Sequence, residues 1–281
     1  GGANWDYINS VVECNDGGYI VGGNFNSTSI DLGNGVNLTN KGNYDGMVIK
    51  YDAEGEVEWA KGIGGISSDS INSVAVTRDG GYIVGGNFTN SIDLGNGISL
   101  ASKSSEDGML IKYSSKGEVE WAKGIGGNGW DYIDSVVKCS DGGYIVGGSF
   151  ESSSIDLGNG ISLANKGEHN GEYDGMVIKY NEKGEVEWAK GIDGTNTDYI
   201  NSVVECNDGG YIVGGSFESS SIDLGNEKTL INNGSADGMI LKITNQLGVP
   251  EVQELEVANS RKKFKITTDV NEIDNIKGGS I

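Results

Sequence analysis

The sequence predicts an all-β fold, a β-propeller built of four-stranded antiparallel blades, and three observations carry this prediction. First, the run GGYIVGG begins at Gly17, Gly80, Gly142 and Gly209, so a unit of roughly 60 residues recurs along the 281-residue chain. Second, each unit consists of short β-branched and aromatic runs separated by turns rich in Asp and Gly. Third, no segment shows the apolar period of a helix. Units of this kind bury their apolar faces against their neighbours.

Each unit is expected to contain four strands in a fixed order. Gly22 and Gly23, inside the second strand, indicate a bulge or a close contact with the neighbouring sheet. The polar stretch that follows holds SIDLGNG and is expected to form a small hairpin on the surface, because length varies only there. The fourth strand carries charges, as an outermost strand does when it is protected from edge-to-edge pairing. In the first unit the four strands are expected at 8–14, 19–25, 47–51 and 56–63.

Large residues recur at equivalent strand positions, one in each unit, and we expect them to form the core between blades. Cysteine also recurs at one repeat position, where the second unit has Thr77. Equivalent positions lie about one repeat apart, which is too far for a disulfide, so three buried thiols are expected. The recurring residues are Phe25, Phe88, Phe150 and Phe217; Met47, Met109, Met176 and Met239; Trp59, Trp121 and Trp188; and Cys14, Cys139 and Cys206.

The repeats divide the chain into two parts. We predict four propeller repeats over 1–248, at about 1–65, 66–127, 128–194 and 195–248. The fourth repeat lacks the GEVEWAKGI strand, and Gly1 stands in the middle of a repeat, so we expect a partial ring cut from a longer protein. Residues 249–281, after the boundary near Pro250, are expected to form a linker and the start of a second β-rich segment, a short C-terminal β tail.

Charge limits the partners. The net charge of −21 repels phosphate backbones and anionic lipid heads, so neither nucleic acid nor a membrane surface is expected to bind. No apolar run is long enough for a transmembrane helix, so membrane insertion is not expected either. The acidity attracts cations or basic partners, or it simply keeps an exposed protein soluble, and the second interpretation is favoured.

Catalytic motifs are missing from the sequence. The single histidine, His169, lies among the extra residues of the third unit, so it cannot serve a role shared by all units. Neither a GxSxG elbow nor a CxxC pair occurs, and a histidine-based metal site is excluded by number. We therefore predict that the chain is not an enzyme. A carbohydrate-active enzyme with carboxylates on the rim stays as the less favoured alternative.

Aspartates recur as three sets, and two roles are open for them. Capping of turns and strand ends needs one carboxylate per turn and is favoured. Calcium binding is the alternative, because Ca²⁺ takes oxygen ligands, although no loop has the density of a dedicated calcium site. No cofactor is expected. The sets are Asp6, Asp69, Asp131 and Asp198; Asp31, Asp93, Asp156 and Asp223; and Asp45, Asp107, Asp174 and Asp237.

Candidate ligand-binding residues lie just before the first strand of three units. Aromatic rings beside a carboxylate on a propeller rim suit stacking against a sugar with hydrogen bonds to its hydroxyls. The alternative is that these residues cap the core at a loop. The candidates are Trp5, Asp6 and Tyr7, then Trp130, Asp131 and Tyr132, and as a weaker version Asp198 and Tyr199.

The string DGMVIKYDAEGEVEWAKGIGG, followed by DSINSV, DGGYIVGGNF and SIDLGNG, resembles the bacterial SBBP-type β-propeller repeat. The double glycine followed by Tyr and Trp is also similar to kelch repeats, at a longer period. The resemblance covers about 1–247. It implies a secreted or surface-attached bacterial protein and offers no catalytic residues. We therefore predict a non-catalytic extracellular binding or adhesion scaffold that takes a protein or glycan ligand on its loop face. A structural spacer presenting another domain is the alternative.

Overall fold

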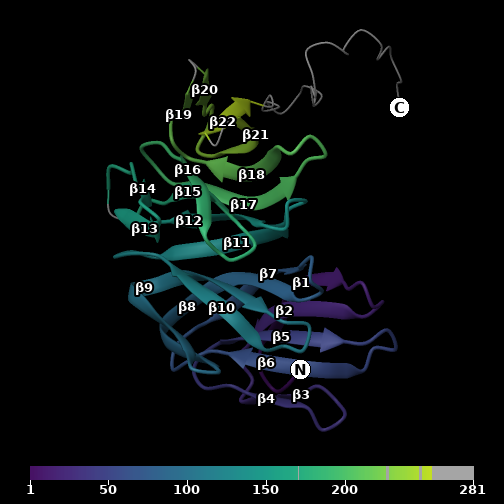
Figure 1. Ribbon diagram of the computed structural model, residues 1–281. Helices are drawn as coiled ribbons and strands as arrows, with labels where there is room; N and C mark the ends of the chain where they lie inside the picture. The colour runs from purple at the N-terminus through teal and green to yellow at the C-terminus, as the bar shows by residue number, and fades with distance from the viewer. Residues whose placement is uncertain (170, 226–227, 247–248, 255–281) are drawn as a thin grey trace, which may run out of the picture.

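The computed structural model describes residues 1–169, 171–225, 228–246 and 249–254, and all the regular elements in them are β-strands. Four antiparallel four-stranded sheets follow one another in chain order, from the purple first blade to the yellow-green fourth blade at the other end (Figure 1). The first strand of each sheet contacts the first strand of the next, so these strands form the inner edge of the arrangement. The fold is therefore a four-bladed β-propeller arrangement, as the sequence predicts.

Each blade runs from an inner strand to an outer strand in chain order. The first comprises β1 (Asp6–Glu13), β2 (Tyr19–Phe25), β5 (Asp45–Tyr51) and β6 (Val57–Ile63). The second comprises β7 (Ser70–Val76), β8 (Tyr82–Gly95), β9 (Ile98–Tyr113) and β10 (Val119–Ile125). The third comprises β11 (Asp131–Lys138), β12 (Tyr144–Phe150), β15 (Asp174–Tyr180) and β16 (Val186–Ile192). The fourth comprises β17 (Asp198–Glu205), β18 (Tyr211–Phe217), β21 (Asp237–Gln246) and β22 (Val249–Glu254).

A small hairpin connects the second and third strands of each blade, as expected from the SIDLGNG stretch. In the second blade the hairpin continues β8 and β9, which pair as far as Gly95 and Ile98. Asn34, Asn96 and Asn159 at the hairpin turns have positive φ, a conformation that Asn tolerates better than most residues. The separate hairpins are β3 (Ser29–Asp31) with β4 (Asn37–Thr39), β13 (Ser154–Gly158) with β14 (Ile161–Ala164), and β19 (Ser221–Gly225) with β20 (Lys228–Ile231).

The outer strand of the fourth blade differs from the sequence-based expectation. Residues 249–281 are predicted to follow the last blade, but β22 pairs antiparallel with β21, from Gln246↔Val249 to Leu241↔Glu254. A sheet edge recruits a strand through its backbone groups, so the GEVEW sequence is not required. Pro250 is compatible with this position, because an outermost strand leaves one row of its backbone groups unpaired. Residues 255–281 lie outside the described residues.

The paired glycines of the second strand serve both purposes suggested by the sequence. The first strand bulges where it faces Gly22 and Gly23. A Cβ atom at Gly23 would stand 2.0 Å from the carbonyl oxygen of Tyr7 in the same blade. A Cβ atom at Gly22 would stand 2.6 Å from Cγ1 of Val74 in the next blade. Glycine therefore lets the sheet bulge and lets two blades approach closely.

Apolar side chains between the blades form the core. Ile20 and Val48 of the first blade pack with Ile71, Val84 and Phe88 of the second, and all five are fully buried. The outer-strand tryptophans cover the second-strand tyrosines of the following blade, with ring centroids 5.6 to 6.1 Å apart. These ring pairs are Trp59 with Tyr82, Trp121 with Tyr144, and Trp188 with Tyr211. The predicted position of the tryptophans between blades is confirmed.

The described residues contain no helix that is long and apolar enough to cross a membrane.

Candidate functional site

Two exposed tryptophans stand on the loops that precede the first strands. Trp5 is 70% exposed and Trp130 is 51% exposed. Backbone hydrogen bonds hold both loops, from Asn26 to the carbonyl of Trp5 and from Glu151 to the carbonyl of Trp130. The two residues belong to the first and third blades, with the second blade between them. They therefore do not form one joint aromatic cluster.

The aspartates beside these tryptophans face into their own loops. The Asp131 carboxylate accepts hydrogen bonds from the Gly127 amide (2.9 Å) and from the hydroxyl of Ser152 (2.6 Å). Asp198 accepts the equivalent bond from Ser219 (2.8 Å), and Asp6 accepts one from Ser27 (2.9 Å). Burial raises the pKa of Asp131 and raises that of Asp198 to about 6. These carboxylates therefore act as loop caps, which is the alternative to ligand binding. Each one connects the loop before the first strand of its blade to the loop after the second strand.

The other two aspartate sets also accept backbone hydrogen bonds. Asp31, Asp93 and Asp156 each accept one from the glycine two residues later, at 2.9 Å, which is an Asx turn. Asp45 and Asp107 accept one from the lysine four residues earlier, at 2.9 and 3.0 Å. Over the described part of the chain, no group of three or more His, Cys, Asp or Glu side chains is placed to hold a metal ion.

Three tyrosines form a continuous row from the third blade across its junction with the fourth blade. Tyr132 and Tyr199, both predicted site residues, contact the ring of Tyr173 in tilted arrangements, with ring centroids 5.9 and 5.6 Å away. The Tyr132 hydroxyl donates to Glu106 of the second blade at 3.3 Å. Tyr7 has a separate partner, Tyr44, at 6.5 Å. Tyr173 and Tyr44 share one repeat position, just before the DGM motif, which is the signal that could have added them to the site.

A polar pocket of about 460 Å³ lies next to the loop that carries Trp130, and Gly129 of that loop is part of its lining. Asn128 and Glu151 line one side, and Asn165 and Glu172, from the connection between β14 and β15, line the other. That connection holds the extra residues of the third unit. The amide of Trp130 donates to the Glu151 carboxylate at 3.0 Å, which fixes the tryptophan loop against the pocket. The sequence reveals the extra residues of the third unit and Trp130 as two separate features. It does not show that the extra residues and the loop of Trp130 border one pocket.

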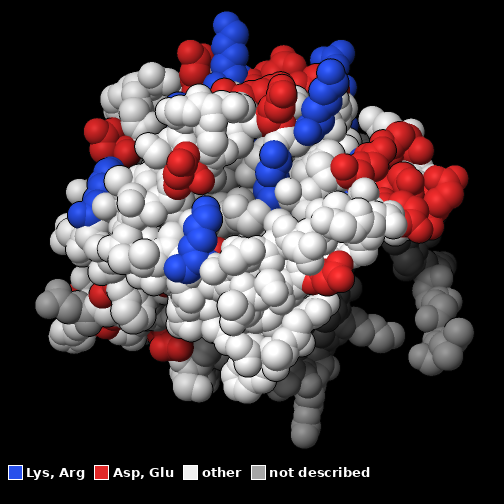
Figure 2. All heavy atoms as spheres, turned by 90° about the horizontal axis from the view of Figure 1, so that it is seen from below, with Lys and Arg blue, Asp and Glu red and all other residues white. Residues whose placement is uncertain are grey.

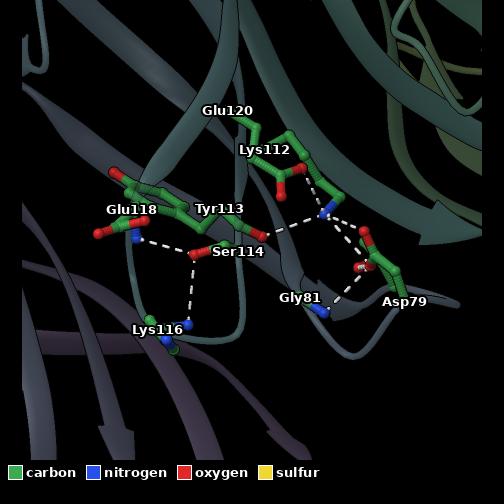
Figure 3. A network of polar contacts seen from close by, with 9 residues as sticks. Asp79, Gly81, Lys112, Tyr113, Ser114, Lys116, Glu118 and Glu120 are labelled. Carbon is green, nitrogen blue, oxygen red and sulfur yellow. Dashed lines mark hydrogen bonds and ion pairs between the residues drawn. The ribbon is translucent and has the colours of Figure 1, made fainter.

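The third strand of each blade carries a buried lysine that forms a polar cluster, drawn for Lys112 in Figure 3. Lys112 Nζ lies 2.9 Å from Asp79 and 3.0 Å from Glu120, and it donates to the carbonyl of Tyr113 at 3.1 Å. Burial alone raises the pKa of Asp79, but hydrogen bonds from Thr77 and Lys112 outweigh it and lower that pKa to about 2. Lys50 and Lys179 make the equivalent pairs. The cluster links the first turn of a blade to its outer strand, so its role is structural.

The fold and the repeat define a β-propeller repeat protein. No protein-family model matches the chain. An uncharacterized WD repeat-containing protein of Acanthamoeba polyphaga mimivirus is 27% identical over 163 residues, which are 56% of this chain and 12% of that protein. The regulatory protein FlaEY of Caulobacter vibrioides is 28% identical over 130 residues, which are 45% of this chain and 14% of that protein. The chain therefore spans only a small part of the curated relatives that it matches.

Among solved structures, a protein of unknown function from Bacteroides caccae aligns with a TM-score of 0.39 and 11% identity. The alignment covers 81% of this chain and 62% of that one.

Proposed function

We propose that this chain is a non-catalytic binding scaffold of a bacterial surface or secreted protein, built from SBBP-type repeats, and that it binds a glycan on the loop face of its third blade. The observation that carries the proposal is the half-exposed Trp130 on a loop whose preceding residues, Asn128 and Gly129, line the polar pocket. An exposed indole with no aromatic partner in its own loop offers a flat apolar face to a ligand. The pocket next to it supplies polar groups that orient the ligand.

The chemistry of the lining favours a polyhydroxylated ligand. Glu151 and Glu172 accept hydrogen bonds, whereas the amides of Asn128 and Asn165 both donate and accept. Sugar hydroxyls do the same, and the apolar face of a sugar ring stacks on an indole. The carboxylates and amides of the pocket can thus both accept hydrogen bonds from sugar hydroxyls and donate hydrogen bonds to them. The scaffold binds its ligand without a cofactor and releases it unchanged.

The test is glycan-array screening of the chain, followed by titration calorimetry with the best ligand. We expect Trp130→Ala to reduce affinity at least about tenfold, which is about 1.4 kcal/mol. Trp5→Ala is the matched control, because it removes another exposed indole that has no part in this pocket, and its affinity should equal that of the parent chain. Unchanged binding by Trp130→Ala overturns the proposed site.

Two further outcomes separate the alternatives. Absence of binding to every glycan and peptide presented would favour the structural spacer, which needs no ligand. Recovery of a cleaved ligand after long incubation would favour the carbohydrate-active enzyme.

A further inference from the structure

The first blade exposes a face that is buried in the other three blades. Ile8, Val11 and Tyr19 are 58, 61 and 42% exposed. Their repeat counterparts are at most 5% exposed, because the preceding blade covers them: Ile71, Ile133 and Ile200; Val74, Val136 and Val203; Tyr82, Tyr144 and Tyr211. Figure 2 views the molecule from the side of the first blade and shows broad areas of uncharged surface between scattered charges. We call Ile8, Val11 and Tyr19 the leading face.

The fourth blade exposes the face that, in the first three blades, packs against the following blade. Val204 is 50% exposed and Ile240 is 37% exposed, whereas their counterparts pack into the cores between successive blades. Gly214 also differs from its counterparts. A Cβ atom there would meet nothing within 4 Å, whereas at Gly22, Gly85 and Gly147 it would press on an Ile and a Val of the next blade. We call Val204, Gly214 and Ile240 the trailing face. It is the repeat equivalent of the surface that covers Ile71 and Val74.

Hydrogen bonds between the inner strands of successive blades also recur at equivalent repeat positions. The amides of Val74, Val136 and Val203 each donate to a serine hydroxyl of the preceding blade, at 3.2, 3.0 and 3.2 Å. The side-chain amide of Asn9 donates to the carbonyl of Ile71 at 2.9 Å, and Asn72 repeats this bond to Ile133 at 2.9 Å. The third blade has Asp134 at the asparagine position, and the corresponding residues of the fourth blade, Asn201 and Ser202, are exposed.

We propose that the trailing face of one molecule docks on the leading face of a second copy of this chain, head to tail. Each of the three internal junctions joins one trailing-type face to one leading-type face, and within the described residues one face of each type is left uncovered. The surface that fits Ile8 and Val11 is therefore already present on the same molecule. In the docked pair, Asn201 donates to the carbonyl of Ile8 and Ser202 accepts from the amide of Val11, which continues both series.

Two features make this contact weaker than the internal junctions. The sequence of β22, VPEVQE, has no tryptophan to cover Tyr19, unlike the outer strands of the first three blades. Each copy also carries a net charge of −21, so two copies repel each other at low ionic strength. Association should therefore strengthen with added salt. Head-to-tail contacts close into a ring when the rotation per copy allows it and otherwise form open chains.

The test is sedimentation of the 281-residue chain over a range of concentrations up to about 100 µM, at low and high salt. We expect species at twice the 29.5 kDa of one chain or larger, in proportions that rise with salt. Val11→Glu disables the leading face, and Gly214→Val disables the trailing face. Both substitutions sit on open surface, so the folded monomer accommodates them. Ile66→Glu, at a residue 80% exposed on neither face, is the matched control.

Mixing the variants separates head-to-tail docking from other modes of association. Each variant alone should stay monomeric, and the control should associate as the parent chain does. A mixture of Val11→Glu and Gly214→Val should form a pair, because each keeps the face that the other has lost. Three results overturn the proposal: a parent chain that stays monomeric at high salt, a variant that associates normally, or a mixture that stays monomeric. Loss of association in Val11→Glu alone would indicate two leading faces in contact.

Discussion

At the residue scale, a lysine buried in each third strand links two segments that are distant in sequence. Lys112 is 2% exposed, but its carboxylate partners, Asp79 and Glu120, are each about half exposed (Figure 3). The ammonium is thus compensated without the full burial of three charges. The pattern DGM-x-x-K shows that a lysine recurs there, but alternation along a strand gives no sign that its charge is directed inward to the Asp-Gly-Gly turn.

Replacement of this lysine should destabilise the fold. We predict that Lys112→Met lowers the free energy of unfolding by about 1–3 kcal/mol, because the charged hydrogen bonds are lost while both carboxylates return to water. Lys116→Met, at an exposed lysine of the same blade, is the control and should change it little. Urea denaturation measures both. Because the folded pKa of Asp79 lies near 2, below its ordinary 3.8, its contribution should persist above about pH 4 and fade between pH 4 and 2. Equal stability of the two variants at neutral pH would contradict this role.

Asp134 takes a position where the other three blades have asparagine, namely Asn9, Asn72 and Asn201. Asn9 and Asn72 donate to a carbonyl of the next blade, but an ionised carboxylate has no proton to donate. Burial raises the pKa of Asp134 from 3.8 to about 6. The folded state thus holds a proton that the unfolded state has lost, so the stability linked to this group is present below about pH 4 and is lost as the pH rises through 6.

The expected consequence is a stabilising substitution. Asp134→Asn should raise the free energy of unfolding by about 1 kcal/mol at pH 8, because the amide can donate at any pH, and by much less at about pH 4. Asn72→Asp should do the reverse. Thermal unfolding of the three chains at both pH values checks this, and a gain from Asp134→Asn that is equal at both would rule out the explanation.

The candidate site shows what sequence can predict about single residues. Comparison of the repeats points to aromatic residues at the loops, and Trp130 is exposed there, while its role in binding stays a prediction. It cannot separate a carboxylate that faces a ligand from one that faces its own loop, because Asx turns use the same residue types as sugar sites. The capping of Asp131 by Ser152 depends on a contact across 21 residues of sequence. Tyr173 becomes part of the row only because two blades meet beside it.

At the element scale, the second strand of each blade determines how closely its neighbour can approach. A Cβ atom at Gly147 would stand 2.6 Å from Cγ1 of Val203 and 2.9 Å from Cγ2 of Ile200, whereas at Gly214 the same atom would meet nothing. We predict that Gly147→Ala lowers the free energy of unfolding by about 1–3 kcal/mol through overpacking. Gly214→Ala, at the same repeat position, should be neutral or slightly stabilising. Urea denaturation compares them, and similar losses from both would show that the blades do not pack face to face.

Element boundaries follow the repeat until the repeat changes. The first three blades have the predicted strands, because alternation and turn residues agree in every copy. The outer strand of the fourth blade is not predicted, because β22 keeps no part of the GEVEW pattern and contains Pro250. Its pairing with β21 depends on backbone groups, which a side-chain pattern does not reveal.

At the scale of the whole molecule, the described residues form a row of junctions of one kind, with one face of the first blade and one face of the fourth blade exposed. A repeat architecture derives its stability from the intrinsic stability of each unit and from contacts with its neighbours. Among the described residues no blade packs on these two exposed faces, so the same residue types are buried in some blades and exposed in others. The sequence predicts the repeat unit and an incomplete ring, but only the structure identifies the residues left uncovered.

Three natural cysteines report on this arrangement, because they share one repeat position. Cys14 lies in the core beside Tyr82 of the next blade, and Cys139 is 1% exposed in the core that includes Tyr211. Cys206 belongs to the last blade and is only half-buried. Burial raises the pKa of Cys139 to about 12, which adds to its protection.

The most direct measurement is the rate at which each thiol reacts with a soluble disulfide reagent under native conditions, followed by mass spectrometry of the peptides. The Val11→Glu chain is used, so that docking between copies does not cover the last blade. If each blade covers its predecessor, Cys206 reacts fastest and Cys139 slowest. Equal rates for the three cysteines, or a Cys139 that reacts as fast as Cys206, would contradict the packing of blade on blade.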